Sequence, residues 1–578
     1  MPTQISAPNL APLNPSQMLA IRYALQHPLS LIQGPPGTGK TLTCSTLVYL
    51  MVMLSSSSHR QQNVYSRGGG GGGDGTGNYF NKEEGQVLVT APSNVAVDQL
   101  AERIHRTGLK VVRLYSKSRE FASLSATSTF CMENLALHKK ILELKTASSD
   151  EMSKYLKLKE HTGELAPADE RRLRLLISRA EMEILQTADV ICTTCAGAGD
   201  NRLQGFRFRQ VVIDEATQAT EPECLIPIVL GAKQVVLIGD HCQLGPVVLS
   251  KKAAAAGLST SLFSRLLSLG HRPLRLKIQY RMHPALSRFP SYFFYDGELQ
   301  DGVTAKDRTY VHPGGSEASQ KFPWPSEERP MFFYHSTAAE EISGSGTSYI
   351  NRVEASNIEK IVTFLLKCGL KASQIGVITP YDGQRAHISS LFQRQTTLGQ
   401  AAFADLEVAS VDAFQGREKD FILLSCVRSN SNTGIGFLAD PRRLNVALTR
   451  AKYGLIVCGN ASVLANYTPP LPRGSPFNSN LSNPNHSSSS YQQYQQGSQP
   501  PPGYTLEPPI WRLLIHHYAK YNLVVDGSLS NLKPSKITLN LPLLTPYGAG
   551  MSSANFINSP YVTGGNSSSY SNTCRSHS

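Results

Sequence analysis

The sequence lacks a long apolar segment. Its longest nearly apolar run is Leu42–Leu54, about 13 residues, whereas a helix needs about 20 apolar residues to cross a bilayer. The first ten residues have neither a basic start nor an apolar core, so we expect no secretory signal. These absences predict a soluble, cytoplasmic protein with no membrane partner.

Paired cysteine motifs are also scarce. The ten cysteines are scattered through apolar stretches, which is typical of reduced, buried thiols in an intracellular protein. Only Cys192 and Cys195 have the C-x-x-C spacing of metal ligands, and no second pair follows them. Because a structural zinc site needs four ligands, we predict no zinc site here.

Acidic residues are fewer than basic ones. The chain has 43 Asp and Glu against 56 Lys and Arg, a formal net charge of +13. This excess favours polyanionic partners, because Lys and Arg displace counterions from phosphates. A generally basic soluble protein would show the same excess, so charge alone does not identify a nucleic-acid partner.

Apolar strands alternate with helices in two blocks, residues 13–272 and 273–471. This alternation predicts an α/β fold with two domains, each built on a parallel sheet covered on both faces. The strands expected in the first block are Leu29–Gln33, Val87–Thr90, Val111–Leu114, Val190–Thr193, Val211–Asp214 and Val235–Gly239. Those expected in the second are Met331–Tyr334, Ile375–Thr379, Val408–Ser410, Phe421–Ser425 and Leu455–Gly459.

Several segments fall outside this alternation. Charged and apolar residues recur at helical spacing in 118–187, which predicts a helical insertion in the first domain. Other segments have a polar or glycine-rich composition, which predicts that they are flexible. The pattern at Trp511–Tyr521 predicts one last helix. The expected segments are an N-terminal tail (1–12), a flexible Gly-rich insertion (55–85), a low-complexity linker (472–503), a C-terminal helix and strand completing the second domain (504–535) and a disordered tail (536–578).

A phosphate-binding loop is the clearest motif. GPPGTGKT at residues 34–41 matches G-x-x-x-x-G-K-[ST], follows an apolar strand and precedes a helix. In such a loop the glycines let backbone N–H groups surround phosphates at a helix N-terminus. We expect Lys40 to reach the β- and γ-phosphates of ATP and the Thr41 hydroxyl to bind Mg²⁺. The backbone contacts would come from Gly34, Gly37, Thr38 and Gly39.

Two carboxylates end the strand that begins at Val211. Asp214 is expected to hold Mg²⁺, and Glu215 to orient and deprotonate the attacking water. On their own the two acids could be a solvated strand end, but beside a phosphate-binding loop they favour ATP hydrolysis. The N-K-x-D element that reads guanine is absent.

The second block supplies two arginines. Arg281 lies in QYRMHP at 279–284, and Arg450 precedes the strand Leu455–Gly459. Arginines supplied across a cleft stabilise charge on a transferring phosphoryl group. The alternative for any one arginine is a surface ion pair.

Taken together, these motifs resemble those of the superfamily 1 helicases and, within them, of the regulator-of-nonsense-transcripts (up-frameshift) RNA helicases of nonsense-mediated mRNA decay. The resemblance spans about residues 10–470 and resumes weakly near 510–533. The blocks that carry it are LNPSQ at 13–17, GPPGTGKT at 34–41, VLVTAPSNVAVDQL at 87–100, VVIDEATQATEPECLIP at 211–227, LIGDHCQLGPVV at 237–248, QYRMHPALSRFPS at 279–291, ITPYDGQR at 378–385, VASVDAFQGREKDF at 408–421 and GFLADPRRLNVALTRAKYG at 436–454.

The resemblance implies two RecA-like domains that bind ATP and a nucleic-acid strand. The implied nucleotide contacts are Gln17 on the adenine edge, Tyr280 stacked on the adenine, Gln243 sensing the γ-phosphate, Arg281 and Arg450 on the phosphates, and Gly416 and Glu418 lining the pocket. The implied strand contacts are Ser93, Asn94, Val411 and Asp412. Such contacts go mainly to sugar and phosphate, so they grip without sequence preference.

The sequence departs from the family pattern in three places. The N-terminal Cys/His-rich zinc domain and the small barrel before the first motif are not found, and the Gly-rich stretch at 66–77 is extra. The resemblance nevertheless implies a monomeric, ATP- and Mg²⁺-dependent 5′-to-3′ RNA helicase that works with mRNA-decay factors. The alternatives are a related superfamily 1 helicase on DNA or RNA outside mRNA decay, and a non-hydrolysing RNA clamp or scaffold.

Overall fold

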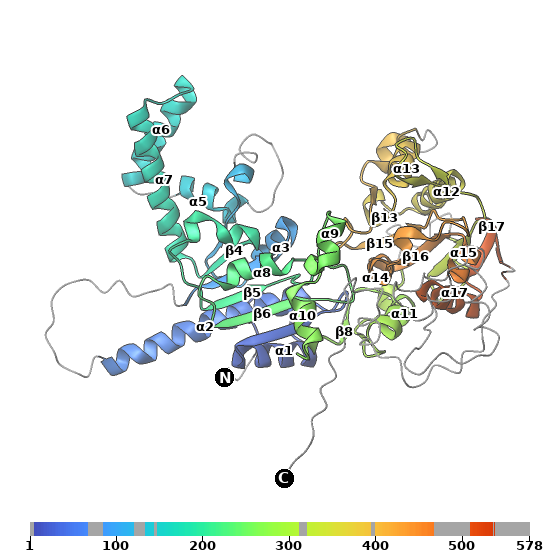
Figure 1. The fold of residues 1–578 in the computed structure, drawn as a ribbon, viewed down its shortest axis with the longest axis horizontal. Helices are drawn as coiled ribbons and strands as arrows, with labels where there is room; N and C mark the ends of the chain where they lie inside the picture. Colours follow the sequence, from blue (N-terminus) through green and yellow to red (C-terminus); the bar gives the residue numbers. More distant parts are fainter. Residues whose placement is uncertain are drawn as a thin grey trace, which may run out of the picture. The chain divides into compact units, whose positions relative to one another are not determined.

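The computed structural model describes residues 5–66, 85–120, 133–143, 147–310, 321–394, 399–467, 509–535 and 537. The chain divides into two compact units. Unit 1 comprises Met1–His241 and Gly245–Ile278, and unit 2 comprises Cys242–Leu244 and Gln279–Ser578. Each unit contains one seven-stranded sheet (Figure 1), as the alternation of strands and helices predicts.

The boundary between the units differs from the predicted one at residue 272. Strand β7 (Leu274–Arg275) pairs with β1 (Leu29–Gln33), and the N–H of Leu276 donates to the carbonyl of Gln33 at 2.8 Å. The chain therefore stays in unit 1 through Ile278. Conversely, Cys242–Leu244 belongs to unit 2 although it lies inside the predicted first domain.

The sheet of unit 1 has the order β3-β4-β2-β5-β6-β1-β7, and its strands pair in parallel. The other strand bounds are β2 Val87–Ala91, β3 Val111–Arg113, β4 Val190–Thr194, β5 Gln210–Ile213 and β6 Gln234–Gly239. Each lies within one residue of its predicted bounds. These strands are recognisable because each is a short apolar run bounded by polar residues.

Helices cover both faces of this sheet. Alternate residues of one strand enter different cores: Leu88 packs in one apolar cluster, and Val87 and Val89 pack in the other. The helices on the Val87 side are α1 (Pro15–Gln26), α2 (Lys40–Ser66) and α3 (Asn94–His105). Those on the other side are α5 (Leu137–Glu143), α6 (Ala147–Thr162), α7 (Pro167–Thr187), α8 (Glu221–Ile228) and α10 (Leu262–Ser268).

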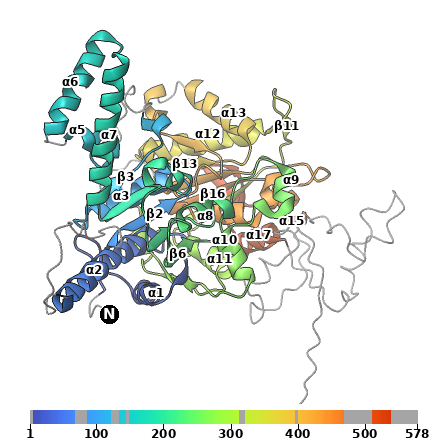
Figure 2. The same cartoon turned by 60° about the vertical axis from the view of Figure 1, so that its left-hand side comes forward.

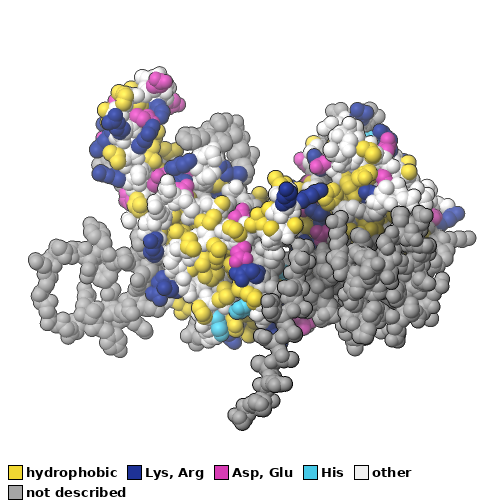
Figure 3. Space-filling model, in the orientation of Figure 1, with side chains coloured by type: hydrophobic (Ala, Val, Ile, Leu, Met, Phe, Trp, Pro, Cys, Tyr) yellow, Lys and Arg dark blue, Asp and Glu magenta, His cyan; other side chains and the backbone are white. Residues whose placement is uncertain are grey.

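The predicted helical insertion is confirmed by α5, α6 and α7. Helices α6 and α7 pack on each other and project beyond the sheet of unit 1 (Figures 1 and 2). Basic and acidic side chains are interspersed on them (Figure 3), and Arg172–Glu151 and Lys159–Glu170 are cross-helix ion pairs. On the face shown, helices α6 and α7 therefore carry mixed charge and form no stripe of basic residues.

Two segments of the N-terminal half that were predicted to be flexible are partly ordered in the structure. Helix α2 continues to Ser66, well into the predicted insertion 55–85, because no Gly or Pro occurs between Ser55 and Ser66. Residues 67–84 lie outside the described part. In the predicted N-terminal tail, Ile5 and Ala7 are buried, so these residues already pack in unit 1.

The sheet of unit 2 has the order β14-β13-β15-β16-β10-β17-β18, parallel except for the β17–β18 pair. Its strands are β10 Met331–His335, β13 Ile375–Ile378, β14 Glu407–Ala409, β15 Lys419–Ser425, β16 Ala451–Gly459, β17 Val524–Ser528 and β18 Asn531–Pro534. Its main helices are α11 Pro284–Phe294, α12 Arg352–Lys367, α13 Asp382–Arg394, α14 Pro441–Leu448, α15 Ala461–Asn466 and α17 Ile510–Lys520. A small hairpin joins β11 (Glu341–Ile342) to β12 (Tyr349–Ile350).

Within the described residues 509–535, a helix and two strands add to unit 2. Helix α17 contributes Trp511, Leu514 and Ile515 to the core, and β17 extends the sheet beside β10. The predicted linker 472–503 and almost all of the predicted tail 536–578 lie outside the described residues. Among the helices that are described, none is both long and apolar enough to cross a bilayer.

Candidate functional site

The glycine-rich segment Gly34–Thr41 forms a tight turn between β1 and α2. The N–H and the hydroxyl of Thr38 both donate to the carbonyl of Pro35, at 3.3 and 2.7 Å. Gly37 and Gly39 have φ of 73° and 76°, a region that glycine adopts at little cost. Helix α2 begins at Lys40, so the free N–H groups of its first turn lie next to this loop. Such a helix start binds anions, phosphate above all.

The side chain of Lys40 folds back across the loop. Its ammonium donates to the carbonyl of Gly34 at 2.9 Å and lies 3.7 Å from a carboxylate oxygen of Glu215. A Cβ at Gly34 would lie 2.0 Å from Cγ of Lys40. Any larger residue at position 34 would therefore displace the side chain of Lys40 from this position.

Asp214 and Glu215 directly follow β5. Strands β1 and β5 flank β6 in parallel, so the loop after β1 and these two carboxylates lie at the same edge of the sheet, where parallel sheets bind ligands. Burial and the charge of Glu215 raise the pKa of Asp214 to about 7. A buried carboxylate of this kind is stabilised by a nearby cation, and its oxygens are the donor type that Mg²⁺ prefers. Thr41, the other predicted Mg²⁺ ligand, lies in the first turn of α2.

The backbone at Glu215 is strained. Its φ is 50°, a conformation uncommon outside glycine, and its N–H donates to Oδ1 of Asp214 at 2.9 Å. The amide of Gln218 donates to Oε2 of Glu215 at 2.9 Å. The carboxylate of Glu215 is thus oriented from both sides, with Lys40 on one oxygen and Gln218 on the other.

Gln17 lies beside the loop, with both ends of its amide engaged. Oε1 accepts from the N–H of Asn14 at 2.9 Å, and Nε2 donates to the carbonyl of Thr38 at 3.0 Å. The first contact belongs to the N-terminal cap of α1. Gln17 therefore ties α1 to the loop, and its amide keeps a second N–H and a second lone pair with which it could contact adenine.

Ser93 and Asn94 follow β2 at the same edge of the sheet. Ser93 is exposed and caps α3, its hydroxyl accepting from the N–H of Ala96 at 3.2 Å. Oδ1 of Asn94 accepts from the buried Arg113 at 2.8 Å, and Arg113 also donates to Asp98 at 2.6 Å. The placement of Asn94 thus depends on a buried ion pair that the sequence patterns did not reveal.

In unit 2, Arg281 is paired with Glu418. Nε of Arg281 donates to Glu418 at 2.6 Å, and Lys452 lies 3.0 Å from the other carboxylate oxygen. Burial alone would raise the pKa of Glu418, but the charges and hydrogen bonds of Arg281 and Lys452 outweigh it and lower the pKa to about 2. The preceding residue, Tyr280, is 41% exposed.

Arg450 is buried and meets Gln243 within unit 2. The guanidinium donates to Oε1 of Gln243 at 2.9 Å and to the carbonyl of Val446 at 2.9 Å. Gln243 is held nearby because the amide of Asn445 donates to the carbonyl of Cys242 at 2.8 Å. Two residues that the resemblance assigned to the phosphates thus share one hydrogen-bonded network.

The remaining predicted residues of unit 2 lie around the start of β15. Gly416 is exposed with φ of 77°, and Asp412 is exposed and paired with Arg443 at 3.4 Å. Val411, for which a strand contact was expected, is a residue only 3% exposed that packs in the core of unit 2. Its carbonyl also accepts from the N–H of Phe414 at 3.2 Å, so neither the side chain nor the backbone of Val411 is presented at the surface.

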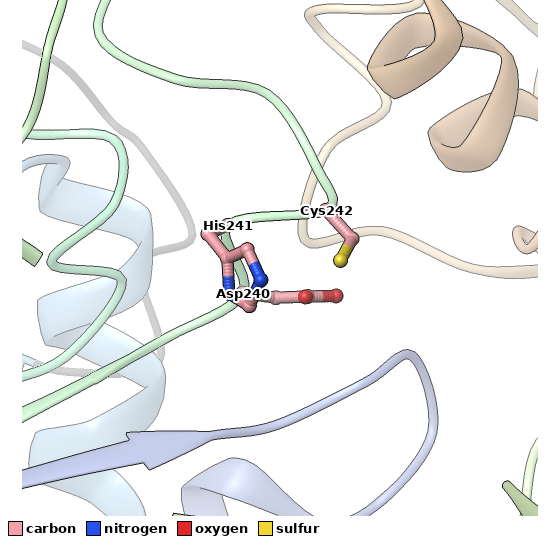
Figure 4. A group of neighbouring side chains, drawn as sticks. All are labelled: Asp240, His241 and Cys242. Carbon is pink, nitrogen blue, oxygen red and sulfur yellow. The ribbon is translucent and has the colours of Figure 1, made fainter. Parts of the chain in front are cut away.

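Within the described residues, one group of His, Cys, Asp and Glu side chains is close enough to hold a metal ion: Asp240, His241 and Cys242 after β6 (Figure 4). Two of them have protein partners, since Gln33 donates to Asp240 at 3.4 Å and Cys242 donates to the carbonyl of Phe294 at 3.2 Å. The boundary between the units also falls inside this group, and we propose no metal site there. Cys192 and Cys195 are both buried and do not belong to the group.

Comparison with known proteins places these sites in a family. Two family models, both described as AAA domain, match residues 12–251 and 258–462. The "Regulator of nonsense transcripts 1 homolog" of Arabidopsis thaliana is 50% identical over 542 residues, 94% of this chain and 37% of that protein. The Drosophila melanogaster protein of the same name is 50% identical over 541 residues, 94% of this chain and 39% of that protein.

A third relative is the "ATP-dependent helicase upf1" of Schizosaccharomyces pombe. It is 53% identical over 467 residues, which are 81% of this chain and 46% of that protein. The chain thus spans less than half the length of each of these three relatives. With half of its residues identical along nearly its whole length, and with both AAA domains matched, the chain belongs to the regulator-of-nonsense-transcripts family.

Proposed function

We propose that this protein is an ATP-dependent RNA helicase and translocase of nonsense-mediated mRNA decay, moving 5′ to 3′ with RNA-stimulated ATP hydrolysis. The observation that carries the proposal is the constellation at the edge of the unit 1 sheet. There Lys40 closes the glycine-rich turn and meets Glu215 at 3.7 Å, beside the buried Asp214. The names of the relatives support the helicase activity and the decay pathway.

In unit 1 the chain would bind and hydrolyse ATP. The N–H groups of the Gly34–Thr41 loop and the ammonium of Lys40 would bind the phosphates. Asp214 and the Thr41 hydroxyl would hold Mg²⁺, which neutralises phosphate charge when it is bound. Glu215, oriented by Gln218, would accept a proton from the attacking water.

In unit 2 the chain would sense the nucleotide. The exposed ring of Tyr280 would stack on the adenine, and Gly416 and Glu418 would line the pocket. Arg281 and Arg450 would stabilise charge on the γ-phosphate, with Gln243 coupled to Arg450. Arg281 and Arg450 now have protein acceptors, so binding would exchange those acceptors for phosphate oxygens.

The nucleic-acid partner would be single-stranded RNA. Ser93 and Asn94 of unit 1, and Asp412 with the neighbouring Val411 in unit 2, would contact the strand at its sugar and phosphate groups. Such contacts do not distinguish ribose from deoxyribose without groups that read the 2′-hydroxyl. We further propose that the protein acts as a monomer in the cytoplasm, together with mRNA-decay factors.

The test is ATP turnover alone, with poly(U) RNA and with poly(dT), for the wild type and Glu215→Gln. We expect RNA to stimulate the wild type. Glu215→Gln should bind ATP but turn over roughly 10²-fold more slowly, because it loses the base and keeps the phosphate contacts. Stronger stimulation by DNA would favour a DNA helicase, and ATP binding without turnover in the wild type would favour an RNA clamp.

A further inference from the structure

The stretch that carries Tyr280 and Arg281 has no regular secondary structure. It lies between β8 (Ile278–Gln279) and α11 (Pro284–Phe294). Its peptide groups are therefore not held by a helix or a sheet, and their partners must come from elsewhere. The direction in which each of the two side chains leaves the backbone depends on those partners.

Arg308 binds two carbonyl groups of this stretch. Its Nε donates to the carbonyl of Arg281 at 2.8 Å, and its Nη2 donates to the carbonyl of Tyr280. A guanidinium is planar and its N–H groups have fixed directions. One side chain thus fixes two consecutive peptide planes relative to each other.

The N–H side of the same stretch is held by Gln279. Its Oε1 accepts from the N–H of Arg281 at 2.9 Å and from the N–H of Met282 at 2.8 Å. Its Nε2 donates to Asp301 at 2.7 Å. With Arg308 on the carbonyls and Gln279 on the N–H groups, the polypeptide around Arg281 is fixed from both sides.

Arg308 is itself well placed for this role. It ends the short helix η6 (Lys306–Arg308), which is fixed by Asp307 accepting from the N–H and hydroxyl of Thr304 at 2.8 and 2.7 Å. The guanidinium also lies 5.9 Å from the centre of the Tyr453 ring. The orientation of the Arg308 side chain is therefore set by contacts within unit 2 alone.

We propose that Arg308 is a positioning residue for the nucleotide site: it aims the ring of Tyr280 and the guanidinium of Arg281. The inference rests on the proposed function, in which these two side chains contact the adenine and the phosphates. Arg308 acts through them and does not touch the nucleotide. A lysine at position 308 cannot replace it, because an ammonium group lacks the planar fork that matches two adjacent carbonyls.

The experiment compares Arg308→Ala and Arg308→Lys with Lys306→Ala. Lys306 is an exposed cation of the same helical turn and serves as the matched control. Both Arg308 variants should lower kcat by roughly 10-fold and raise KM for ATP several-fold, since a displacement of about 1 Å can cost roughly 10²-fold in rate. Lys306→Ala should match the wild type, and thermal unfolding should show that all the variants are folded.

A double variant separates positioning from general damage. In an Arg281→Ala background, Arg308→Ala should cause no further loss of kcat, because the group it aims is gone. The rise in KM should persist, because Tyr280 is still displaced. If Arg308 had a merely structural role, the loss of kcat in the double variant would be the product of the losses in the two single variants. That result would overturn the inference.

Two further outcomes are decisive. Wild-type kcat and KM in a folded Arg308→Lys protein would refute the inference, and this variant decides the question if Arg308→Ala does not fold. If the wild type hydrolyses ATP while the Arg308 variants are unaffected, the positioning role alone fails. If the wild type hydrolyses no ATP with or without RNA, the proposed function fails, and the inference fails with it.

Discussion

The ammonium of Lys40 has two oxygen partners in unit 1, the carbonyl of Gly34 and the carboxylate of Glu215. ATP phosphates would compete for this charge at the start of α2. We expect Lys40→Ala to abolish ATP hydrolysis and to weaken ATP binding, as measured by turnover and by titration with a fluorescent ATP analogue. Lys157→Ala, which removes an exposed cation from α6, is the control and should leave both quantities unchanged. Wild-type turnover in Lys40→Ala would contradict the assignment of the phosphate site.

Glu354 is a buried acid of unit 2 that is unrelated to the nucleotide residues. Its carboxylate accepts from the hydroxyl of Ser425 at 2.6 Å and from the N–H of Val427 at 3.0 Å. Val427 has φ of 68°, which is rare for a β-branched residue. The carboxylate therefore holds a strained turn at the end of β15.

This carboxylate should make the stability of unit 2 depend on pH. Burial raises the pKa of Glu354 from 4.5 to about 7, against the effect of its hydrogen bonds. Between these pH values the folded protein keeps the proton and the unfolded chain does not, so the free energy of unfolding falls as pH rises through this window. The slope is at most about 1.4 kcal/mol per pH unit.

Glu354→Gln tests this dependence. The variant cannot ionise, so the difference between its urea-unfolding midpoints at pH 5 and pH 8 should be smaller than that of the wild type. The absolute midpoints can shift in either direction, because a glutamine brings a buried amide donor that needs an acceptor. An unchanged difference between the two pH values would show that Glu354 is ionised in the folded protein at pH 5.

At the scale of elements, α17 fixes the edge of the unit 2 sheet. Trp511 is 1% exposed, and its indole N–H donates to the carbonyl of Leu438 at 2.7 Å. Trp511→Ala should lower the free energy of unfolding of unit 2 by about 3–5 kcal/mol, because it leaves a cavity. Trp511→Phe should cost less, since it removes the hydrogen bond and keeps most of the apolar contact. Equal urea midpoints for the wild type and Trp511→Ala would mean that α17 is not part of the cooperative unit.

The sequence predicted those elements whose signal is local. Strand β1 is a short apolar run before a glycine-rich loop, so its position could be predicted. The hairpin β11–β12 was missed because its strands are two residues each, too short for a periodic pattern. The burial of Val411 was also missed, because a motif match does not indicate which face of the chain packs inward.

Residues that act through distant contacts gave no signal either. Arg113 and Arg308 lie outside the recognised phosphate and arginine motifs. Arg113 meets Asn94 from 19 positions away, and Arg308 meets Tyr280 from 28 positions away. Such partners are brought together only by the folded chain, so a single sequence does not reveal them.

At the scale of the whole molecule, ATP and RNA should influence each other's binding. The phosphate loop belongs to unit 1, whereas Arg281 and Arg450 belong to unit 2. A nucleotide that engages both groups favours one arrangement of the units, and a strand that contacts both units senses that arrangement. We expect RNA affinity to fall when a non-hydrolysable ATP analogue binds, and ATP affinity to fall by the same factor when RNA binds.

Arg281→Ala and Arg450→Ala should each abolish this coupling while ATP still binds through the loop. The measurement is RNA affinity with and without the analogue, at one fixed salt concentration, because phosphate contacts make affinity steeply salt-dependent. A wild-type RNA affinity that ignores the nucleotide would count against a motor built from both units.

The three residues Cys242–Leu244 give the chain an unusual connectivity. The polypeptide leaves unit 1 after His241, returns at Gly245 and leaves again after Ile278. No single cut in the backbone can therefore yield two intact halves. A fragment ending at Ile278 would carry these three residues without the Asn445 amide that binds the carbonyl of Cys242, and a fragment beginning at Gln279 would leave Arg450 without Gln243. A chimaera joined at Ile278 would therefore have to keep Cys242 and Gln243 matched with Asn445 and Arg450.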